Sequence, residues 1–410
     1  MTAMPMSGVR VLDLTRVLAG PFAGQMLADL GAEVIKIERP GVGDEARIFG
    51  PPFLKSASGE DLPQTAMFLS ANRNKKSIVI DFSKPAGAAL IRELAAKSDV
   101  FLENFKVGDL ARFGLDYDSL KAVNPRLVYC SITGFGQTGP YRERRGYDPI
   151  MQAMCGIMSV TGDPDGVRGG GPIKAGPSIT DLFAGCYAVI AIQGALYHRD
   201  VHGGDGQHID IALLDAGVSM MAHPAMHYVL SGTLAGRVGN QANGGVPGGG
   251  FQCSDGYIMV APGNNELYRT FCQVLGRQDL ATDARFATNA SRVKHRELLV
   301  GILEGVIAGW RVQDLYEALI AAGVPAGPVN DLAQVFADPQ VQSRGMVVDV
   351  AHPTADSVRM VANPIRYSET KIAGYTAPPG PGEHTAAVLG ELLDMKDAEL
   401  DRFRAEKVIA

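Results

Sequence analysis

Asp181 is the residue whose position in this sequence most favours chemistry. It follows Pro177 to Thr180 and opens a run of small apolar residues, 181–199, that predicts one long helix. A carboxylate in the first turn of a helix meets the positive end of the dipole and free backbone N–H groups. Both favour the ionised form that a nucleophile needs. The same position suits an aspartate that only stabilises its helix, so the spacing alone leaves both roles open.

A glycine-rich segment, 239–250, is the second candidate, and its last seven residues read GGVPGGG. Glycines let a backbone come close to a ligand. The N–H groups of Gly248, Gly249 and Gly250 are suited to stabilising a developing oxyanion. The alternative is a flexible connector between domains.

Basic side chains lie near the expected ends of strands, where phosphates and carboxylates would need them as partners. Most lysines and arginines are simply solvated, so each one alone is a weak signal. The candidates are Arg16, Arg39, Arg47, Arg73, Lys75, Lys76 and Arg145. Asn104 and Phe105 follow a short apolar strand, where they either contact a ligand or form a turn and a core contact.

Composition excludes several classes of function. A length of 410 residues exceeds one hydrophobic core and favours two domains, while a net charge of −6 argues against nucleic acid as a partner. Five scattered cysteines and eight histidines form no metal-ligand or disulfide pattern, so we expect no metal and a cytoplasmic location. The apolar run 182–197 is short and contains two glycines, which favours a buried helix over a membrane span.

Strand-like and helix-like segments alternate in the first third of the chain, which predicts an α/β fold with a parallel sheet. The expected strands are 9–14, 33–38, 77–80, 100–102 and 127–130, and the expected helices are 22–30, 86–97 and 117–123. The first strand leads into TRVLAGP instead of GxGxxG, so this Rossmann-like pattern does not indicate a nicotinamide cofactor. The carboxyl ends of the strands still favour ligand binding.

Three regions follow from these patterns. We expect a large Rossmann-like domain at 1–225, a smaller α+β domain at 226–333, and a C-terminal segment at 334–410 that returns to the large domain.

Together these segments resemble the class III CoA-transferases, the family that includes formyl-CoA transferase and carnitine CoA-transferase. The resemblance covers nearly the whole chain and is carried by GVRVLDLTRVLAGPFAGQMLADLGAEVIKIERPGVGDEAR (8–47), SANRNKKSIVID (70–81), LENFKVGDLARFGL (102–115), YCSITGFGQTGPY (129–141), GYDPIMQAMCGIMSVTG (146–162) and SITDLFAGCYAVIAIQGALYHRD (178–200). Within the family, GNN (263–265) and GVPAGPVNDLAQVFADPQV (323–341) look most like the dicarboxylate CoA-transferases that act on succinate or glutarate.

The resemblance implies a ring-like subunit in an interlocked homodimer, an acyl-CoA and a carboxylic acid as substrates, and no tightly bound cofactor. It makes Asp181 the residue that forms covalent intermediates and places Val17 and Leu18 on a loop beside the thioester. The implied contacts to coenzyme A are Arg39, Lys75, Asn104, Phe105, Arg112 and Arg145. Asp148 stands where formyl-CoA transferase has a glutamate, and Arg16 or Arg47 is the expected partner of a distal carboxylate.

Two rival functions remain. An acyl-CoA racemase of the same fold would place a histidine base where this chain has Tyr147, and a tyrosine with a pKa of ~10 is a poor base at neutral pH. A regulatory protein that binds coenzyme A without turnover would have no use for Asp181.

Overall fold

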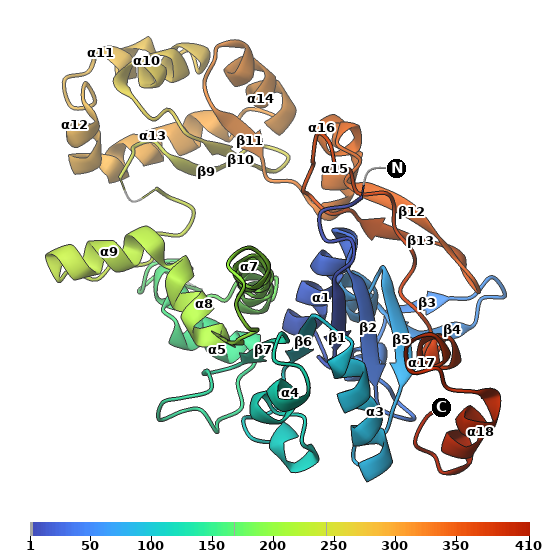
Figure 1. Cartoon of the computed structure of the whole chain (residues 1–410). Helices are drawn as coiled ribbons and strands as arrows, with labels where there is room; N and C mark the ends of the chain where they lie inside the picture. The colour runs from blue at the N-terminus through green and yellow to red at the C-terminus, as the bar shows by residue number, and fades with distance from the viewer. Residues whose placement is uncertain (1–2, 168, 243) are drawn as a thin grey trace. The chain divides into compact units, whose positions relative to one another are not determined.

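The structure is a computed structural model that describes residues 3–167, 169–242 and 244–410, and it divides into two compact units (Figure 1). The first unit comprises the chain up to Ile157, Ala175–Met226 and Gln342–Ala410. The second comprises Met158–Lys174 and His227–Val341. The domain boundaries expected from the sequence stay a prediction.

A six-stranded sheet forms the centre of the first unit, and every neighbouring pair in it is parallel. Its strands, in the spatial order β5-β2-β1-β6-β7-β8, are Lys75–Val79, Glu33–Glu38, Arg10–Asp13, Val100–Glu103, Val128–Thr133 and His208–Ala212. The central strands β1, β6 and β7 are mostly apolar because helices cover both faces of the sheet, whereas the edge strands β5 and β8 read KKSIV and HIDIA. The expected α/β class with a parallel sheet is therefore confirmed.

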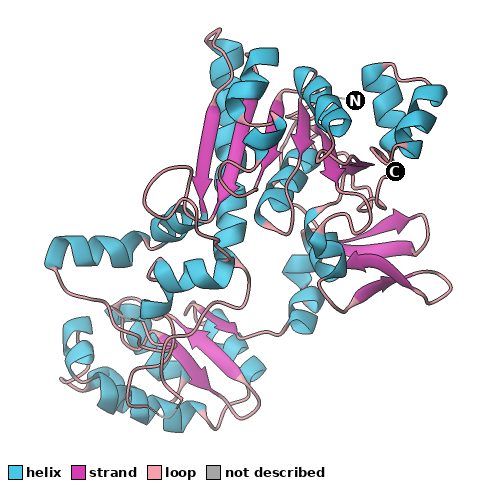
Figure 2. Cartoon of the chain, turned by 90° about the horizontal axis from the view of Figure 1, so that it is seen from below, coloured by secondary structure: helices cyan, strands magenta, loops and turns pink. Residues whose placement is uncertain are grey.

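Helices pack against the strands of this sheet (Figure 2), and each face of the sheet has its own apolar core. The first core joins the sheet to α1 (Ala19–Asp29), α5 (Asp148–Met154), α7 (Ile179–Val201) and α8 (Leu213–Met220). The second core joins it to α3 (Pro85–Ala96), α4 (Tyr117–Val123), α17 (Thr385–Leu393) and α18 (Asp397–Ala405). Shorter elements complete this unit: η1 (Glu45–Ile48), α2 (Ala66–Ala71), η2 (Leu110–Phe113), and the hairpins β3 (Phe53–Lys55) with β4 (Asp61–Thr65) and β12 (Val347–His352) with β13 (Asp356–Val361).

The C-terminal segment packs against strand β5. The backbone N–H of His384 donates to the carbonyl of Ser77, and Thr385 Oγ1 accepts from Val79 N at 3.1 Å. Ile409 forms a β-bridge with Ile80. Residues more than 300 positions apart in the chain thus share one core.

The second unit has its own core around an antiparallel sheet of β9 (Gly249–Gln252), β10 (Tyr257–Val260) and β11 (Ala326–Pro328). Its helices are α10 (Asn265–Val274), α11 (Gln278–Thr282), α12 (Asn289–Lys294), α13 (Arg296–Ile307), α14 (Val312–Ala321) and α15 (Leu332–Ala337). Three helices lie at the boundaries between the units: α6 (Ile157–Val160), α9 (Ala222–Ser231) and α16 (Pro339–Ser343).

The strand at 33–38 and the helix at 117–123 match their predicted bounds, and the other predicted elements of the first third differ by a few residues. The prediction that the whole segment 239–250 is a loop is wrong at its end, because Gly249 and Gly250 begin strand β9 and pair with Val260 and Met259. Among the described residues, α7 is the one helix with the length and composition of a membrane span. It buries nine of its residues in the first unit, so the prediction of a buried helix holds.

Candidate active site

The order of the strands marks one place in the sheet for ligand binding. From β1 the chain moves outward through β2 to β5, and it then returns to the other side of β1 with β6. In parallel α/β sheets, ligands bind at such a switch point, outside the carboxyl ends of the strands. Here those ends lead into Arg16 after β1 and Asn104 after β6.

The residues at this switch point contact one another. The side-chain amide of Asn104 accepts from Arg16 N at 3.0 Å and donates to Arg16 O at 2.8 Å. The guanidinium of Arg16 lies 4.5 Å from the centre of the Phe105 ring. Glu45 Oε1 forms ion pairs with both Arg16, at 3.1 Å, and Arg39, at 3.3 Å. Because two guanidinium groups share one carboxylate, the rim of this edge carries an excess of positive charge that suits an anionic ligand.

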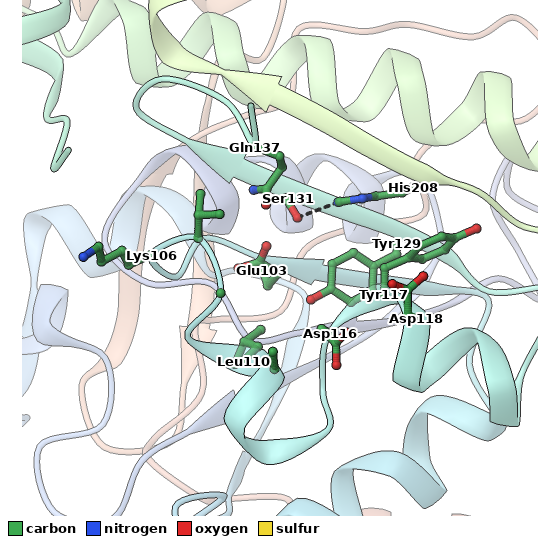
Figure 3. A pocket seen from close by; sticks show the side chains of 13 residues that line it. Glu103, Lys106, Leu110, Asp116, Tyr117, Asp118, Tyr129, Ser131, Gln137 and His208 are labelled. Atoms are coloured by element: carbon green, nitrogen blue, oxygen red, sulfur yellow. Dashed lines mark hydrogen bonds between the residues drawn. The ribbon is translucent and has the colours of Figure 1, made fainter. Parts of the chain in front are cut away.

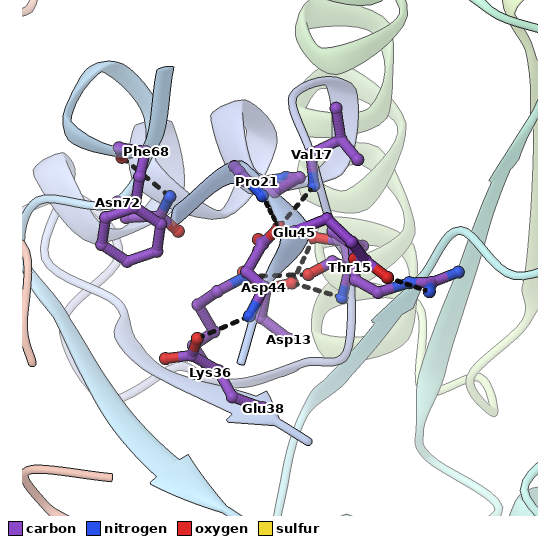
Figure 4. A network of polar contacts seen from close by, with 12 residues as sticks. Asp13, Thr15, Val17, Pro21, Lys36, Glu38, Asp44, Glu45, Phe68 and Asn72 are labelled. Carbon is purple, nitrogen blue, oxygen red and sulfur yellow. Dashed lines mark hydrogen bonds and ion pairs between the residues drawn. The ribbon is translucent and has the colours of Figure 1, made fainter. Parts of the chain in front are cut away.

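The loop after β1 contains a strained residue. Val17 has a φ of 71°, a left-handed conformation that β-branched residues rarely adopt. Its N–H donates to Asp44 Oδ1 at 3.0 Å (Figure 4). Leu18 follows as the N-cap residue of α1. Outliers of this kind gather at functional sites, where the surroundings hold them in place.

Asp181 lies in the first turn of α7, as predicted. The N-cap residue, Ser178, makes no side-chain capping bond. Asp148 of α5 caps the helix instead: its Oδ1 accepts from Thr180 N at 2.8 Å and from Thr180 Oγ1 at 2.7 Å. Gln152 Nε2 donates to the other oxygen of Asp148 at 2.7 Å. Asp148 therefore fixes the backbone directly before the candidate nucleophile.

Burial, together with the negative charge of Asp148, raises the pKa of Asp181 to about 7. Burial and the charge of Asp148 thus act against the ionisation that the position at the helix start favours. Within the described part of the chain, no hydrogen bond or ion pair holds the carboxylate of Asp181. Its oxygens are thus available to a ligand.

The packing of α7 on α1 indicates the level at which Asp181 lies. Gly185, one turn after Asp181, lies so close to α1 that a Cβ atom there would be 2.8 Å from Ala19 O. Farther along α7, Gln193 contacts Met6, which is hydrogen-bonded to Leu30 beyond the end of α1. The two helices therefore run in the same direction. Asp181 lies one turn before Gly185, at the level of the residues that precede α1, which are Val17 and Leu18.

Two predicted ligand contacts are buried and already paired. Lys75 Nζ donates to Asp13 Oδ2 at 2.9 Å, to Pro21 O at 2.8 Å and to Asn72 Oδ1 at 3.0 Å, and burial lowers its pKa to about 8. Arg47 is fully buried, with two bonds to Glu38 and its guanidinium over the ring of Phe68. Their roles toward coenzyme A or a substrate stay predictions.

The remaining predicted residues lie outside this cluster. Arg112 is exposed on η2 and pairs with Asp109 at 3.4 Å. Arg145 is exposed in the segment before α5, and Tyr147, the N-cap residue of α5, is 62% exposed. Gly248, Gly249 and Gly250 belong to the second unit. The contacts predicted for these residues stay untested.

A cavity of about 360 Å³ lies on the sheet face opposite α7 and was missed by the sequence argument (Figure 3). Ser131 Oγ bonds His208 Nε2 at 2.9 Å, and Glu103 accepts from Phe105 N at 2.7 Å. Burial raises the pKa of Glu103 to about 7. The one feature of the sequence that points to this cavity is Glu103, a charged residue at the end of the apolar strand β6. No group of three or more ligating side chains suited to a metal occurs in the described residues.

Residues 6–385 match the model of CoA-transferase family III. The chain is 47% identical to a succinate–glutarate CoA-transferase of Agrobacterium fabrum, over 95% of this chain and 96% of that protein. It is 40% identical to the human succinyl-CoA:glutarate CoA-transferase, over 99% of this chain and 90% of that protein. The crystal structure of a CaiB/BaiF family protein from Brucella suis matches with a TM-score of 0.87 and 46% identity, covering 95% of this chain and all of that one.

Proposed function

Because the chain belongs to CoA-transferase family III, we propose that it moves coenzyme A from succinyl-CoA or another dicarboxyl-CoA to a free carboxylic acid. The observation that carries the proposal is the carboxylate of Asp181, which is unpaired among the described residues at the level of the strained loop. Coenzyme A is a substrate in this scheme, and no resident cofactor or metal is needed. The transfer exchanges one thioester for another, so it is close to thermoneutral.

In the first half of the reaction, an oxygen of Asp181 attacks the thioester carbonyl carbon of the donor. The C–S bond breaks, coenzyme A leaves as a thiolate, and a mixed anhydride remains on Asp181. The thiolate then attacks the Asp181 carbonyl carbon. The donor acid leaves as a carboxylate, and an aspartyl-CoA thioester forms.

In the second half, the acceptor carboxylate attacks the aspartyl thioester and releases the thiolate, which gives a second anhydride. The thiolate attacks the acceptor carbonyl, so acyl-CoA forms and Asp181 returns as a carboxylate. A pKa of about 7 supports this role, because Asp181 is ionised in a large fraction of molecules at neutral pH yet is more basic than an ordinary aspartate.

The positive rim at the carboxyl ends of β1, β2 and β6 is the proposed site for coenzyme A. Arg39 is half exposed and offers a donor to a phosphate, while Asn104 and Phe105 border the same edge. We further propose contacts from Val17, Leu18, Arg112 and Arg145, whereas the three N–H donors of Lys75 are all bound within the protein. The N–H groups of Gly248, Gly249 and Gly250 are proposed to receive the oxyanions of the tetrahedral intermediates after a rearrangement of this segment, because Gly248 N and Gly250 N here donate to Gly245 O and Asn240 O, each at 3.0 Å.

A homodimer with interlocked, ring-like subunits is also proposed. Phe183, Ile190 and Tyr197 are spaced seven residues apart on α7, so they share one face of the helix. Each is at least 43% exposed in the single chain. A second copy would cover this apolar stripe, and sedimentation at dilute concentration should then show no folded monomer. The five cysteines form no disulfide, which supports the proposed cytoplasmic location.

Asp181→Asn tests the chemistry. The variant should fold and bind acyl-CoA yet lose nearly all CoA exchange, because an amide cannot form the anhydride. Hydroxylamine added after acyl-CoA should modify Asp181 in the wild type, which mass spectrometry detects. Asp215→Asn, in the first turn of the neighbouring helix α8, is the matched control and should exchange normally. Near-normal exchange by Asp181→Asn would exclude this mechanism.

A further inference from the structure

Side chains from four segments hold the backbone of the loop after β1. Asp13 Oδ1 accepts from Thr15 N at 2.9 Å, and Lys36 Nζ donates to Thr15 O at 2.8 Å. Asn104 binds both the N–H and the carbonyl of Arg16, and Asp44 accepts from Val17 N. The backbone polar groups from Thr15 N to Val17 N are thus all bound to side chains. A loop held this completely has one conformation.

The chain turns back tightly after this stretch. Gly20 lies against Thr15 so closely that a Cβ atom on Gly20 would be 2.3 Å from Thr15 Cγ2. No other residue fits at Gly20 while the loop keeps this shape. Val17 lies between Thr15 and Gly20, so a change in its φ would move the start of α1.

Three buried ion pairs lie beneath the loop: Lys36 with Asp44 at 2.8 Å, Lys75 with Asp13 at 2.9 Å, and Arg47 with Glu38 at 2.6 Å. All six side chains are at most 3% exposed, and their charges cancel. Buried ion pairs are often no more stabilising than apolar residues of the same size. Figure 4 shows that Asp13, Lys36 and Asp44 instead converge on the loop, which points to a positioning role.

We propose that Asp44 is a positioning residue that holds Val17 in its left-handed conformation and so fixes the loop against the first turn of α7, where Asp181 lies. Asp44 Oδ1 binds Val17 N and Ala46 N, while Oδ2 pairs with Lys36. One carboxylate thus joins the loop to η1 and to β2. The inference rests on the function proposed above, because the reacting carbonyl must lie between Asp181 and this loop.

Asp44→Asn isolates this role with little change in shape. The ammonium of Lys36 attracts the amide oxygen, so the NH₂ group of the new asparagine faces Val17 N–H, and the hydrogen bond is lost. Without this hydrogen bond, the left-handed conformation of a valine is less populated than its ordinary conformations by roughly tenfold. If only that conformation is competent, kcat should fall about tenfold. KM for acyl-CoA should change by less than about threefold, because Arg39 and Phe105 keep their places.

Val17→Gly should rescue this loss, because glycine adopts positive and negative φ about equally well. The double variant Asp44→Asn/Val17→Gly is expected to recover kcat to within about threefold of Val17→Gly alone. A carboxylate that served only to stabilise the fold would show no such rescue. Asp29→Asn is the matched control: it disrupts a buried ion pair, Asp29 with Arg73 at 2.6 Å, at the far end of α1. Its kcat should stay near that of the wild type.

Hydrogen exchange of the peptide that spans residues 15–20 provides a readout independent of turnover. Exchange at Val17 should be faster in Asp44→Asn and unchanged in Asp29→Asn. If Asp44→Asn does not fold, Lys36→Met/Asp44→Ala, which removes both members of that ion pair, replaces it. Because Lys36 also donates to Thr15 O, the double variant is then compared with Lys36→Met alone. Unchanged exchange at Val17, or a kcat loss that Val17→Gly does not relieve, would overturn the role of Asp44. Absence of CoA exchange in the wild type would instead reject the proposed function.

Discussion

Replacing Asp181 by asparagine should stabilise the folded protein more at pH 8 than at pH 5. Burial and the charge of Asp148 raise the pKa of Asp181 from 3.8 to about 7. Between these two values the folded state binds more protons than the unfolded state, so stability falls as the pH rises. Asparagine carries no charge at either pH and avoids this loss.

The expected size follows from the same two pKa values. Each pH unit in the interval costs ~1.4 kcal/mol, so between pH 5 and pH 8 the wild type loses at most about 2.6 kcal/mol relative to the variant. Because Asp181 is partly exposed, we expect a measured difference of about 1–2 kcal/mol. Urea unfolding of both proteins at pH 5, 6, 7 and 8, at one protein concentration, gives this value.

The dependence on pH decides the test, because a stabilisation that is equal at pH 5 and pH 8 would reflect a change in packing. Asp215→Asn, at an exposed aspartate of α8, is the control for the substitution itself. A gap between wild type and Asp181→Asn that shrinks with rising pH would refute the raised pKa of Asp181.

Three other predictions follow from the site. Asp148→Asn should move the acid limb of the pH profile of kcat/KM from about pH 7 to a lower pH that is still above that of an ordinary aspartate, because burial is the larger cause of the raised pKa and stays in place. An unmoved limb would show that Asp148 does not couple to Asp181. Arg16→Gln should raise KM for dicarboxylic acceptors several-fold more than for monocarboxylic ones, since Arg16 is partly exposed whereas Arg47 is buried against Glu38. An equal rise in KM for both classes of acceptor would assign Arg16 to coenzyme A or to folding. In deuterium oxide without an acceptor acid, a 2-methylacyl-CoA should gain no deuterium at the α carbon; rapid exchange lost in Tyr147→Phe would favour the racemase instead.

The sequence predicted five of the six strands in the sheet of the first unit, because each contains a short apolar run next to a helix-like segment. Strand β8 was not predicted, because its residues, HIDIA, alternate between polar and apolar and are only partly buried. Short elements such as η1 and the hairpin of β3 and β4 have no comparable pattern, and they were missed. The partners of Lys75 and Arg47 could not be predicted, since a lysine or arginine near a strand end reads the same whether it faces solvent or a buried carboxylate. Only the fold brings Asp13, 62 residues earlier, to Lys75.

Three local rules fail at one place in this protein. A β-branched residue takes a positive φ at Val17, charged pairs lie in the core beneath it, and a helix-start aspartate, Asp181, has a raised pKa. Each of these three features is unfavourable for the folded state by itself, so the contacts around them must compensate. Departures of this kind are expected where selection favours activity over stability. Their convergence at the carboxyl end of β1 is a physical reason, independent of any relative, to place the chemistry there.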